Sequence, residues 1–188
     1  MEIIILRHGK PIIPSLSKIS PLEFSEWVNT YNSAGLSPSS KPTVDVINIS
    51  KKCNAFVCSE LPRSIESANA LEINEITLKS ALFNEAGLPV SNLRFPLLSP
   101  KAWAVIFRIL WVFGYSKNSE SFSEAKVRAA ESADKLKELA YEKSVVLFVG
   151  HGVYNRMIAK ELNASGWSGP KNPGTKHWSY GVYKSKRT

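Results

Sequence analysis

Cysteine is scarce in this chain of 188 residues, which contains only Cys53 and Cys58. Two cysteines cannot build a disulfide scaffold, and neither has the neighbours of a zinc site. The longest apolar run, 102–114, is interrupted by Arg108, whereas a membrane-spanning helix needs about 20 apolar residues. The first residues contain no positively charged region before a long apolar stretch, so they indicate no secretory signal. These absences predict a cytoplasmic protein with reduced thiols and no integral membrane segment.

Positive charge is in moderate excess, because 24 Lys and Arg against 16 Asp and Glu give a formal net charge of +8. An excess of this kind raises the question of nucleic acid or of phosphorylated ligands. The basic residues are scattered, however, and no segment resembles a nucleic-acid-binding module. We therefore expect a solvated basic surface with a few functional cations and no nucleic-acid partner. The length and the hydrophobic share of 44% suit one globular domain over 1–188.

Strands are predicted where short runs of apolar and β-branched residues occur. These runs lie at 2–6, 55–58, 76–83, 145–149 and 179–184. Helices are predicted between them, at 21–33, 43–52, 61–71, 122–141 and 153–162. Strands that alternate with helices imply crossover connections, so the fold class is α/β with a largely parallel sheet and helices on both faces.

Chemically reactive residues follow the first four predicted strands, at the sheet edge where ligands bind in such folds. They are, in chain order, Arg7, His8, Arg63, Glu85 and His151. Each of the two histidines precedes a glycine, Gly9 or Gly152. Glycine lets a ligand approach the backbone closely and leaves amide groups free to donate to an anion. The pattern therefore predicts an anion-binding pocket at this edge of the sheet.

Two guanidinium groups and two imidazoles around one pocket are suited to the oxygens of a phosphoryl group. Neighbouring positive charge disfavours protonation of an imidazole, so one histidine is expected to be neutral near pH 7 and able to attack phosphorus. The leaving oxygen then needs a proton, for which Glu85 is the candidate general acid. Lys10 either offers a further charge to an anionic substrate or lies solvated at the rim.

Four segments together resemble the histidine phosphatase superfamily, the phosphoglycerate mutase-like proteins. Leu6-Arg7-His8-Gly9 resembles the family's signature at the end of its first strand. Three further segments resemble the second arginine, the acid and the second histidine of the family. They are Cys58-Ser59-Glu60-Leu61-Pro62-Arg63-Ser64, Leu82-Phe83-Asn84-Glu85 and Val149-Gly150-His151-Gly152. The segments have the order and usual spacing of the family and cover roughly positions 2–165.

The resemblance implies a three-layer α/β/α sandwich, an insertion at about 86–121 that covers the active site, and no metal or other cofactor. It implies that His8 is the nucleophile and becomes a phosphohistidine, with Glu85 as the proton donor. It also implies that Arg7, Arg63 and His151 hold the phosphoryl group of a small phosphorylated substrate. The interpretation of the residues themselves adds Gly9, Gly152 and Lys10 to the expected binding residues.

The residues after the first signature depart from the family. Mutases and sugar bisphosphatases usually continue with a Ser or Thr and then an Asn, whereas this chain continues with Lys10-Pro11-Ile12-Ile13-Pro14. The departure favours a metal-independent phosphomonoester hydrolase over a phosphoglycerate mutase-type phosphotransferase. The same residues are also compatible with a phosphohistidine protein phosphatase and with a non-catalytic phosphate-binding interaction module.

The apolar segment 103–113 has three open interpretations. It is core packing, a lid whose aromatic side chains shape an apolar leaving-group pocket, or a contact with a membrane surface or with a second copy in a homodimer. Other residues are expected to have structural or surface positions: His177, the inert thiol of Cys58, and Asn155 and Arg156 in helix packing behind the pocket. Arg94 and Arg108 either meet a second anionic group or are surface cations.

Overall fold

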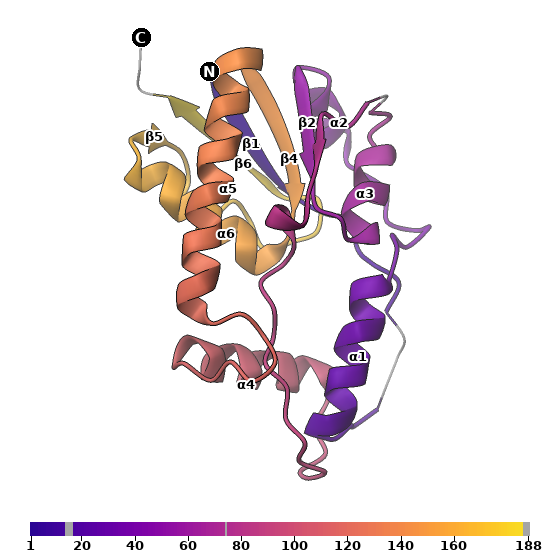
Figure 1. Ribbon diagram of the computed structural model, residues 1–188. Helices are drawn as coiled ribbons and strands as arrows, with labels where there is room; N and C mark the ends of the chain where they lie inside the picture. The colour runs from indigo at the N-terminus through magenta and orange to yellow at the C-terminus, as the bar shows by residue number, and fades with distance from the viewer. Residues whose placement is uncertain (14–16, 74, 186–188) are drawn as a thin grey trace.

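The computed structural model describes residues 1–13, 17–73 and 75–185, and its centre is a six-stranded sheet of order β3-β2-β4-β1-β6-β5 (Figure 1). Four neighbouring strands run parallel: β1 (Glu2–Arg7), β2 (Ala55–Cys58), β3 (Leu78–Lys79) and β4 (Val145–Gly150). β6 (Tyr180–Ser185) pairs antiparallel with β1 and with the short β5 (Trp167–Ser168). The mostly parallel α/β sheet expected from the sequence is confirmed.

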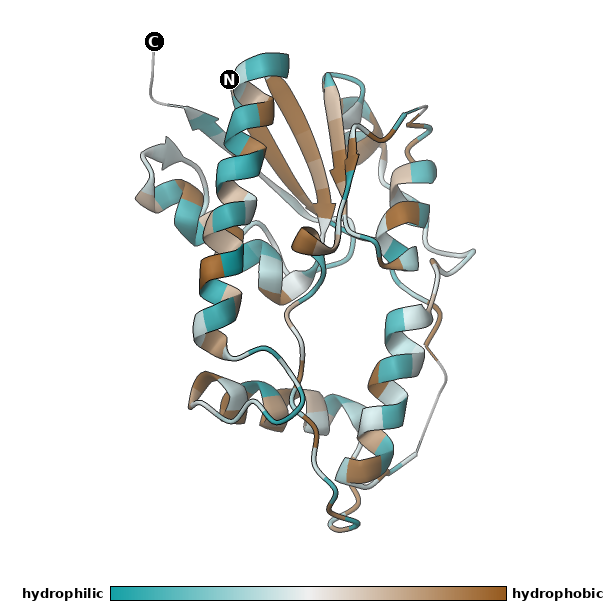
Figure 2. Ribbon diagram, viewed as in Figure 1, coloured by the Kyte–Doolittle hydropathy of each residue, from teal (hydrophilic) through white to brown (hydrophobic). Residues whose placement is uncertain are grey.

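Helices cover both faces of the sheet because side chains alternate along its strands. Ile3 and Ile5 of β1 pack with α5 (Phe122–Lys143) and α6 (Gly152–Ala164). Ile4 and Leu6 face the other way, toward α2 (Val44–Ser50) and α3 (Pro62–Asn69). The central strands β1 and β4 are brown, that is hydrophobic, along most of their length in Figure 2, and the two hydrophobic clusters on either side of the sheet make the arrangement a three-layer sandwich.

Two further helices, α1 (Pro21–Ser33) and α4 (Pro100–Val112), lie beyond the carboxyl ends of the parallel strands (Figure 1). They share a separate hydrophobic cluster, in which the Phe24 ring stacks on Phe107 at 5.4 Å between centroids. Ser99 caps α4 by accepting a hydrogen bond from the backbone N–H of Ala102. Most of the segment expected to cover the site, 86–121, is therefore loop and one helix packed on α1.

The third strand is shorter than the sequence predicts. We expected a strand over 76–83, but only Leu78 and Lys79 pair with β2, and a 3₁₀ turn follows at Ala81–Phe83. The Ser80 side chain caps this turn, and the Phe83 ring packs against Phe148 at 5.0 Å. Burial of Phe83 under the sheet edge thus ends the strand early. The Gly/Pro-rich stretch before residue 174 also contains the unpredicted strand β5.

No helix in the three ranges that the structure describes is both long enough and apolar enough to cross a membrane.

Candidate active site

Strand register places the two predicted histidines side by side. β1 and β4 are neighbours in the sheet, and Arg7 is the register partner of Gly150. The residues that follow them in the chain, His8 and His151, therefore lie next to each other. The backbone N–H of His8 donates to the carbonyl of Gly150 at 3.0 Å. The ring centroids of His8 and His151 lie 5.0 Å apart, and both side chains are buried.

Hydrogen bonding determines which nitrogen of His8 carries its proton. Nδ1 lies 2.6 Å from the carbonyl oxygen of Gly9, and a carbonyl can only accept, so Nδ1 is the protonated nitrogen. Burial lowers the pKa of His8 well below its ordinary value, and the charges of Arg63, His177 and Arg7 lower it further, against the opposing effect of the Gly9 hydrogen bond. The ring is therefore neutral at pH 7 and has its lone pair on Nε2.

His151 is oriented in the complementary way. Its Nε2 lies 2.7 Å from the hydroxyl of Ser59, which also accepts a hydrogen bond from the backbone N–H of Leu61. The Ser59 hydroxyl already accepts one hydrogen bond, so its own proton is used best as a donor to Nε2 of His151. In that arrangement the proton of the neutral His151 ring is on Nδ1, which is then a donor. Burial, followed by the charges of His8 and Arg63, lowers the pKa of His151 well below the usual value. His151 thus offers a neutral N–H beside His8.

Arg63 lies in the first turn of α3 and is completely buried. Its Nη1 donates to the carbonyl oxygens of Tyr31 and Asn32 at 3.0 and 3.4 Å, and its guanidinium lies 4.5 Å from the Tyr31 ring centroid. These carbonyls end α1, where the helix dipole favours a positive charge. The end of α1 therefore holds Arg63 in place.

Arg7 ends β1 and packs against the backbone of the second histidine segment. Its Nη1 donates to the carbonyl oxygen of Thr175. A Cβ atom added to Gly152 would lie 3.2 Å from the Cζ atom of Arg7, so a larger residue there would press on the guanidinium. Glycine at position 152 therefore permits this close approach.

Each of Arg7, Arg63 and His151 keeps one buried nitrogen without a hydrogen-bond partner in the described part of the chain. Among the residues that the structure describes, five buried side-chain nitrogen or oxygen atoms have no hydrogen-bond partner. Three of the five belong to this site: Nε of Arg7, Nε of Arg63 and Nδ1 of His151. Buried polar groups are normally paired, and unpaired donors beside two guanidinium groups are suited to an anion.

Glu85 is held at the N-terminus of α6. Its carboxylate accepts hydrogen bonds from the backbone N–H groups of Val153 at 3.1 Å, Tyr154 at 2.8 Å and Ala86 at 3.0 Å. An acidic group at this end of a helix is favoured by the unpaired N–H groups and by the helix dipole. Glu85 thus anchors the first turn of α6 through the two residues that come immediately after His151 and Gly152 in the chain.

Comparison with known proteins gives a fold. No protein-family model and no curated protein sequence matches the chain. Among solved structures, a mycobacterial glucosyl-3-phosphoglycerate phosphatase is 17% identical with a TM-score of 0.60, covering 96% of this chain and 88% of that one. A Bacillus anthracis phosphoglycerate mutase is 18% identical with a TM-score of 0.59, covering 97% and 88%. This chain has the phosphoglycerate mutase-like fold of these proteins.

A phosphoserine phosphatase from Entamoeba histolytica has the same fold at 13% identity and a TM-score of 0.53, covering 87% of this chain and 80% of that one. Identities this low establish shared architecture only. The expected phosphoglycerate mutase-like sandwich is confirmed.

Two of the expected binding residues, Gly9 and Lys10, have other surroundings in the structure. The backbone N–H of Gly9 donates to the hydroxyl of Ser67 at 2.9 Å, so the expectation of a free amide at this position is wrong. A Cβ atom on Gly9 would lie 2.5 Å from side-chain atoms of Leu36 and Trp178, and close packing therefore requires the glycine. Lys10 is exposed, and its charge contributes to lowering the pKa of His177.

His177 is the main residue of the site whose position the sequence did not indicate. We expected a structural or surface histidine, but its ring centroid lies 5.4 Å from that of His8. Its Nδ1 is 3.1 Å from the carbonyl oxygen of His8 and must be the donor. Burial, the charge of Arg7 and that of Lys10 lower its pKa, against the effect of the His8 hydrogen bond. The antiparallel return of β6 along β1 brings this distant segment to the site, and nothing in the local sequence predicts it.

Three buried serines support the site from α3 and the turn before it. Ser59 bonds His151, the Ser64 hydroxyl donates to the carbonyl of Val149, and the Ser67 hydroxyl donates to the carbonyl of Arg63. A usable signal was present, because polar residues 63, 64 and 67 share one face of the short helix. A polar face that is buried rather than solvated marks a helix that packs against a polar site.

Asn155 ties the two histidine strands together behind the site. Its Oδ1 accepts the backbone N–H of His151 at 2.8 Å, and its Nδ2 donates to the carbonyl of Leu6 at 3.1 Å. This confirms the expected packing position of Asn155, whereas Arg156 faces a cavity instead.

The thiol near the site has no activating partner. Burial raises the pKa of Cys58 to about 11, although Lys79 slightly opposes the shift. The expectation of an inert thiol agrees with this environment. Over the described ranges, no three or more His, Cys, Asp or Glu side chains are grouped as metal ligands would be.

Proposed function

We propose that the protein is a phosphomonoester hydrolase that forms a covalent phosphohistidine on His8. The observation that carries the proposal is the hydrogen bond from Nδ1 of His8 to the Gly9 carbonyl, at 2.6 Å. This bond leaves the lone pair on Nε2 of a neutral imidazole, among unpaired donors suited to a phosphoryl group. A nucleophile and an anion trap in one buried place support phosphoryl transfer more than binding alone.

The first step transfers the phosphoryl group to His8. Nε2 attacks phosphorus, an N–P bond forms, and the bond between phosphorus and the alcohol oxygen breaks. Arg7, Arg63 and the Nδ1–H of His151 stabilise the charge on the equatorial oxygens as it redistributes. Because these donors are held by backbone carbonyls, Gly152 and Ser59, they require little reorganisation during the reaction.

Proton transfer is assigned to Glu85. As a carboxylic acid it gives its proton to the leaving alcohol oxygen, and as a carboxylate it then takes a proton from the water that attacks the phosphohistidine. Hydrolysis of the N–P bond releases inorganic phosphate and restores His8. The three N–H groups that hold Glu85 in this structure give it a second, structural part, the anchoring of α6.

Small phosphomonoesters are the proposed substrates, and hydrolysis is favoured over mutase chemistry. The names of two structural neighbours describe phosphatases, of glucosyl-3-phosphoglycerate and of phosphoserine, and a third is a phosphoglycerate mutase. Lys10 and Pro11 occupy the positions at which the mutase pattern continues with a Ser or Thr. This difference supports a phosphatase with a different substrate preference.

Trapping of the phosphoenzyme tests the proposal. The protein is mixed with a phosphorus-labelled aryl phosphate, quenched in alkali and then exposed to acid, which cleaves phosphohistidine but not phosphoserine. We expect an acid-labile label in the wild-type chain and in His177→Ala, the matched control for loss of a neighbouring imidazole. His8→Ala is expected to give neither label nor turnover.

Normal hydrolysis by the His8→Ala variant would overturn the covalent mechanism. Vanadate, which mimics the transferring phosphoryl group, is expected to inhibit, and a structure of the mycobacterial glucosyl-3-phosphoglycerate phosphatase contains VO3. Vanadate binding without turnover on a broad panel of esters would favour the non-catalytic phosphate-binding module.

A further inference from the structure

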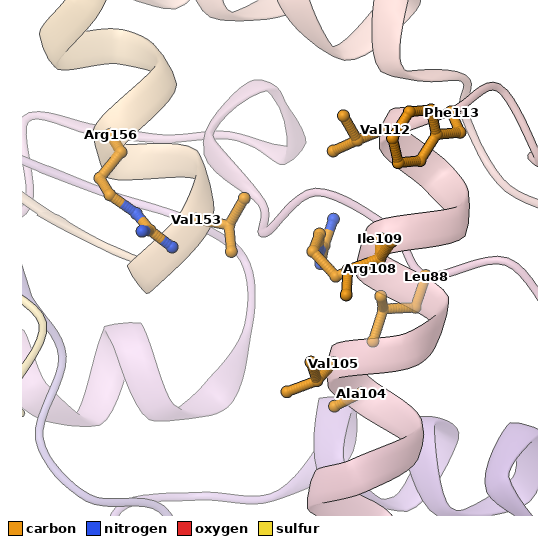
Figure 3. Close-up of a pocket in the computed structure, with 9 residues that line it drawn as sticks. All are labelled: Leu88, Ala104, Val105, Arg108, Ile109, Val112, Phe113, Val153 and Arg156. Carbon is orange, nitrogen blue, oxygen red and sulfur yellow. The ribbon is translucent and has the colours of Figure 1, made fainter.

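A cavity of about 480 Å³ lies between α4 and the first two turns of α6 (Figure 3). Its walls include the side chains of Val105, Ile109 and Val112 from α4 and Val153 from α6. Two arginines, Arg108 of α4 and Arg156 of α6, extend into the space between the helices. The proposed chemistry uses none of these side chains.

The cavity adjoins the proposed phosphoryl site. Val153 lines it, and the backbone N–H of the same residue donates to Glu85. Arg156 donates through Nε to the carbonyl of Gly152 at 3.2 Å, and the other side of Gly152 faces the Arg7 guanidinium. A substrate whose phosphoryl group lies against Arg7 therefore has this cavity beside its leaving group.

The α4 wall is apolar although it is solvent-exposed. Trp103, Phe107 and Trp111 bury the opposite face of the helix, whereas Val105 and Ile109 are 60% and 53% exposed. These three aromatic side chains are thus used in packing, whereas Phe113, which is 84% exposed, lines the cavity together with aliphatic side chains. Exposed apolar side chains gathered in a concave place are typical of a binding site for an apolar group.

The two arginines give the cavity a positive charge. Nη1 and Nη2 of Arg108 donate to the carbonyls of Gly87 and Ala86 at 3.0 and 2.9 Å, and its guanidinium lies 4.6 Å from the Trp111 ring centroid. Arg108 is therefore a fixed cation, which argues against the second of its two expected positions, that of a solvated surface residue. Arg156 is exposed and bonds only through Nε among the hydrogen bonds of the described residues, so its Nη groups can meet an anion.

We propose that this cavity binds the alcohol part of the substrate and selects phosphomonoesters whose alcohol combines an apolar body with a carboxylate or another acidic group. The apolar body packs on the α4 wall, and the acidic group pairs with Arg156 and Arg108. The inference rests on the proposed function, because it takes the phosphoryl group to lie at His8.

Binding to a variant that cannot turn over tests the inference separately from catalysis. Calorimetry with His8→Ala compares three esters: glycerol phosphate, naphthyl phosphate and carboxynaphthyl phosphate. We expect naphthyl phosphate to bind about ten-fold more tightly than glycerol phosphate, because the ring buries apolar surface. Carboxynaphthyl phosphate is expected to bind about ten-fold more tightly again, because its carboxylate is paired.

Substitutions in the cavity separate the two contributions. In the His8→Ala background, Ile109→Asn is expected to weaken both naphthyl esters by about five-fold and leave glycerol phosphate unchanged. Arg156→Gln is expected to remove most of the advantage of the carboxylate and leave naphthyl phosphate within about two-fold. Val44→Asn is the matched control, because Val44 is 74% exposed on α2 and lies outside the cavity.

Equal affinity for the three esters, or equal effects of Ile109→Asn and Val44→Asn, would overturn the inference. Circular dichroism checks that each variant is folded. Selective binding by a protein that forms no phosphoenzyme would reject the proposed function and keep the cavity assignment. Phosphoenzyme formation with no selectivity among the esters would keep the proposed function and reject the cavity assignment.

Discussion

The end of the sheet that holds the histidines and the α1–α4 pair beyond it are built in different ways. At the sheet end, backbone hydrogen bonds and strand register place buried polar groups, as with His8 on Gly150 and Arg63 on Tyr31. In the α1–α4 pair, stacked aromatic rings such as Phe24 and Phe107 provide the contact. The buried polar groups of the candidate site are thus positioned by the backbone, whereas the α1–α4 pair is held together by side-chain packing.

Of the changes that distinguish the two regions, removal of the Arg63 side chain is expected to have the largest effect on activity. Arg63→Ala should lower kcat/KM for p-nitrophenyl phosphate by about 100-fold or more, because an oriented donor to the transferring group is worth about 3 to 4 kcal/mol. Steady-state kinetics gives the value. Arg156→Ala, outside the phosphoryl site, is expected to change the same parameter by less than about three-fold, and equal losses would erase the distinction between the two regions.

Truncation of Phe107 should destabilise the packing of α1 on α4. Phe107→Ala is expected to lower the free energy of unfolding by about 3 kcal/mol, because the buried ring leaves a cavity between α1 and α4. Urea denaturation provides the measurement. Val105→Ala on the exposed face of the same helix is the control, with an expected loss below about 0.5 kcal/mol. A small loss for Phe107→Ala would mean that the pair does not pack as a unit.

Glu85→Gln tests whether the acid acts chemically or only anchors α6. A proton donor matters for a poor leaving group, so turnover of an alkyl phosphate should fall by about 100-fold and that of p-nitrophenyl phosphate by less than about ten-fold. The amide oxygen of Gln can still accept the N–H groups of Tyr154 and Ala86, which share Oε1 of Glu85, whereas the bond from Val153 to Oε2 is lost, so part of the anchor is preserved. Parallel losses on both esters would assign Glu85 to anchoring alone.

The buried histidines predict a loss of stability on acidification. The pKa values of His8 and His151 are lower in the folded protein than in the unfolded chain, where they are about 6.5. As pH falls below 6.5, the unfolded chain binds protons that the folded protein does not, so the free energy of unfolding falls by up to about 1.4 kcal/mol per pH unit for each histidine.

Urea denaturation at pH 7.5 and 5.5 measures this loss. His8→Asn should show a smaller decrease than the wild-type chain, because one of the two buried groups no longer titrates. A decrease of the same size in both proteins would show that other groups are responsible.

His177→Gln should produce the smallest change. The charge of His177 contributes to lowering the pKa of His8, so its removal should move the acidic limb of the kcat/KM profile to higher pH by less than about one unit. Lys10→Gln is the control, because Lys10 acts on His177 and is not among the groups that lower the pKa of His8. A shift to lower pH, or no shift, would contradict the electrostatic contact between the two imidazoles.

Much of the fold was predictable because its signals are local. The parallel strands of the centre and the helix caps depend on short runs of side chains, and α1 begins at Pro21 as expected, with Ser20 as its cap. The third strand was overestimated because the burial of Phe83 against Phe148 is a tertiary contact. The unpredicted β5 depends on pairing with β6, which a stretch of two residues cannot signal alone.

The sequence by itself determined which residue types end each parallel strand, because an apolar run followed by Arg7-His8 or by His151 is legible in the chain. Parallel strands share a carboxyl edge, so these residues were bound to meet once the sheet formed. Only the tertiary structure decided that His177 joins them, that the Gly9 amide bonds Ser67, and that Arg108 and Arg156 face one cavity. These contacts join segments distant in the chain through strand pairing and helix packing, for which the local pattern of side chains contains no information.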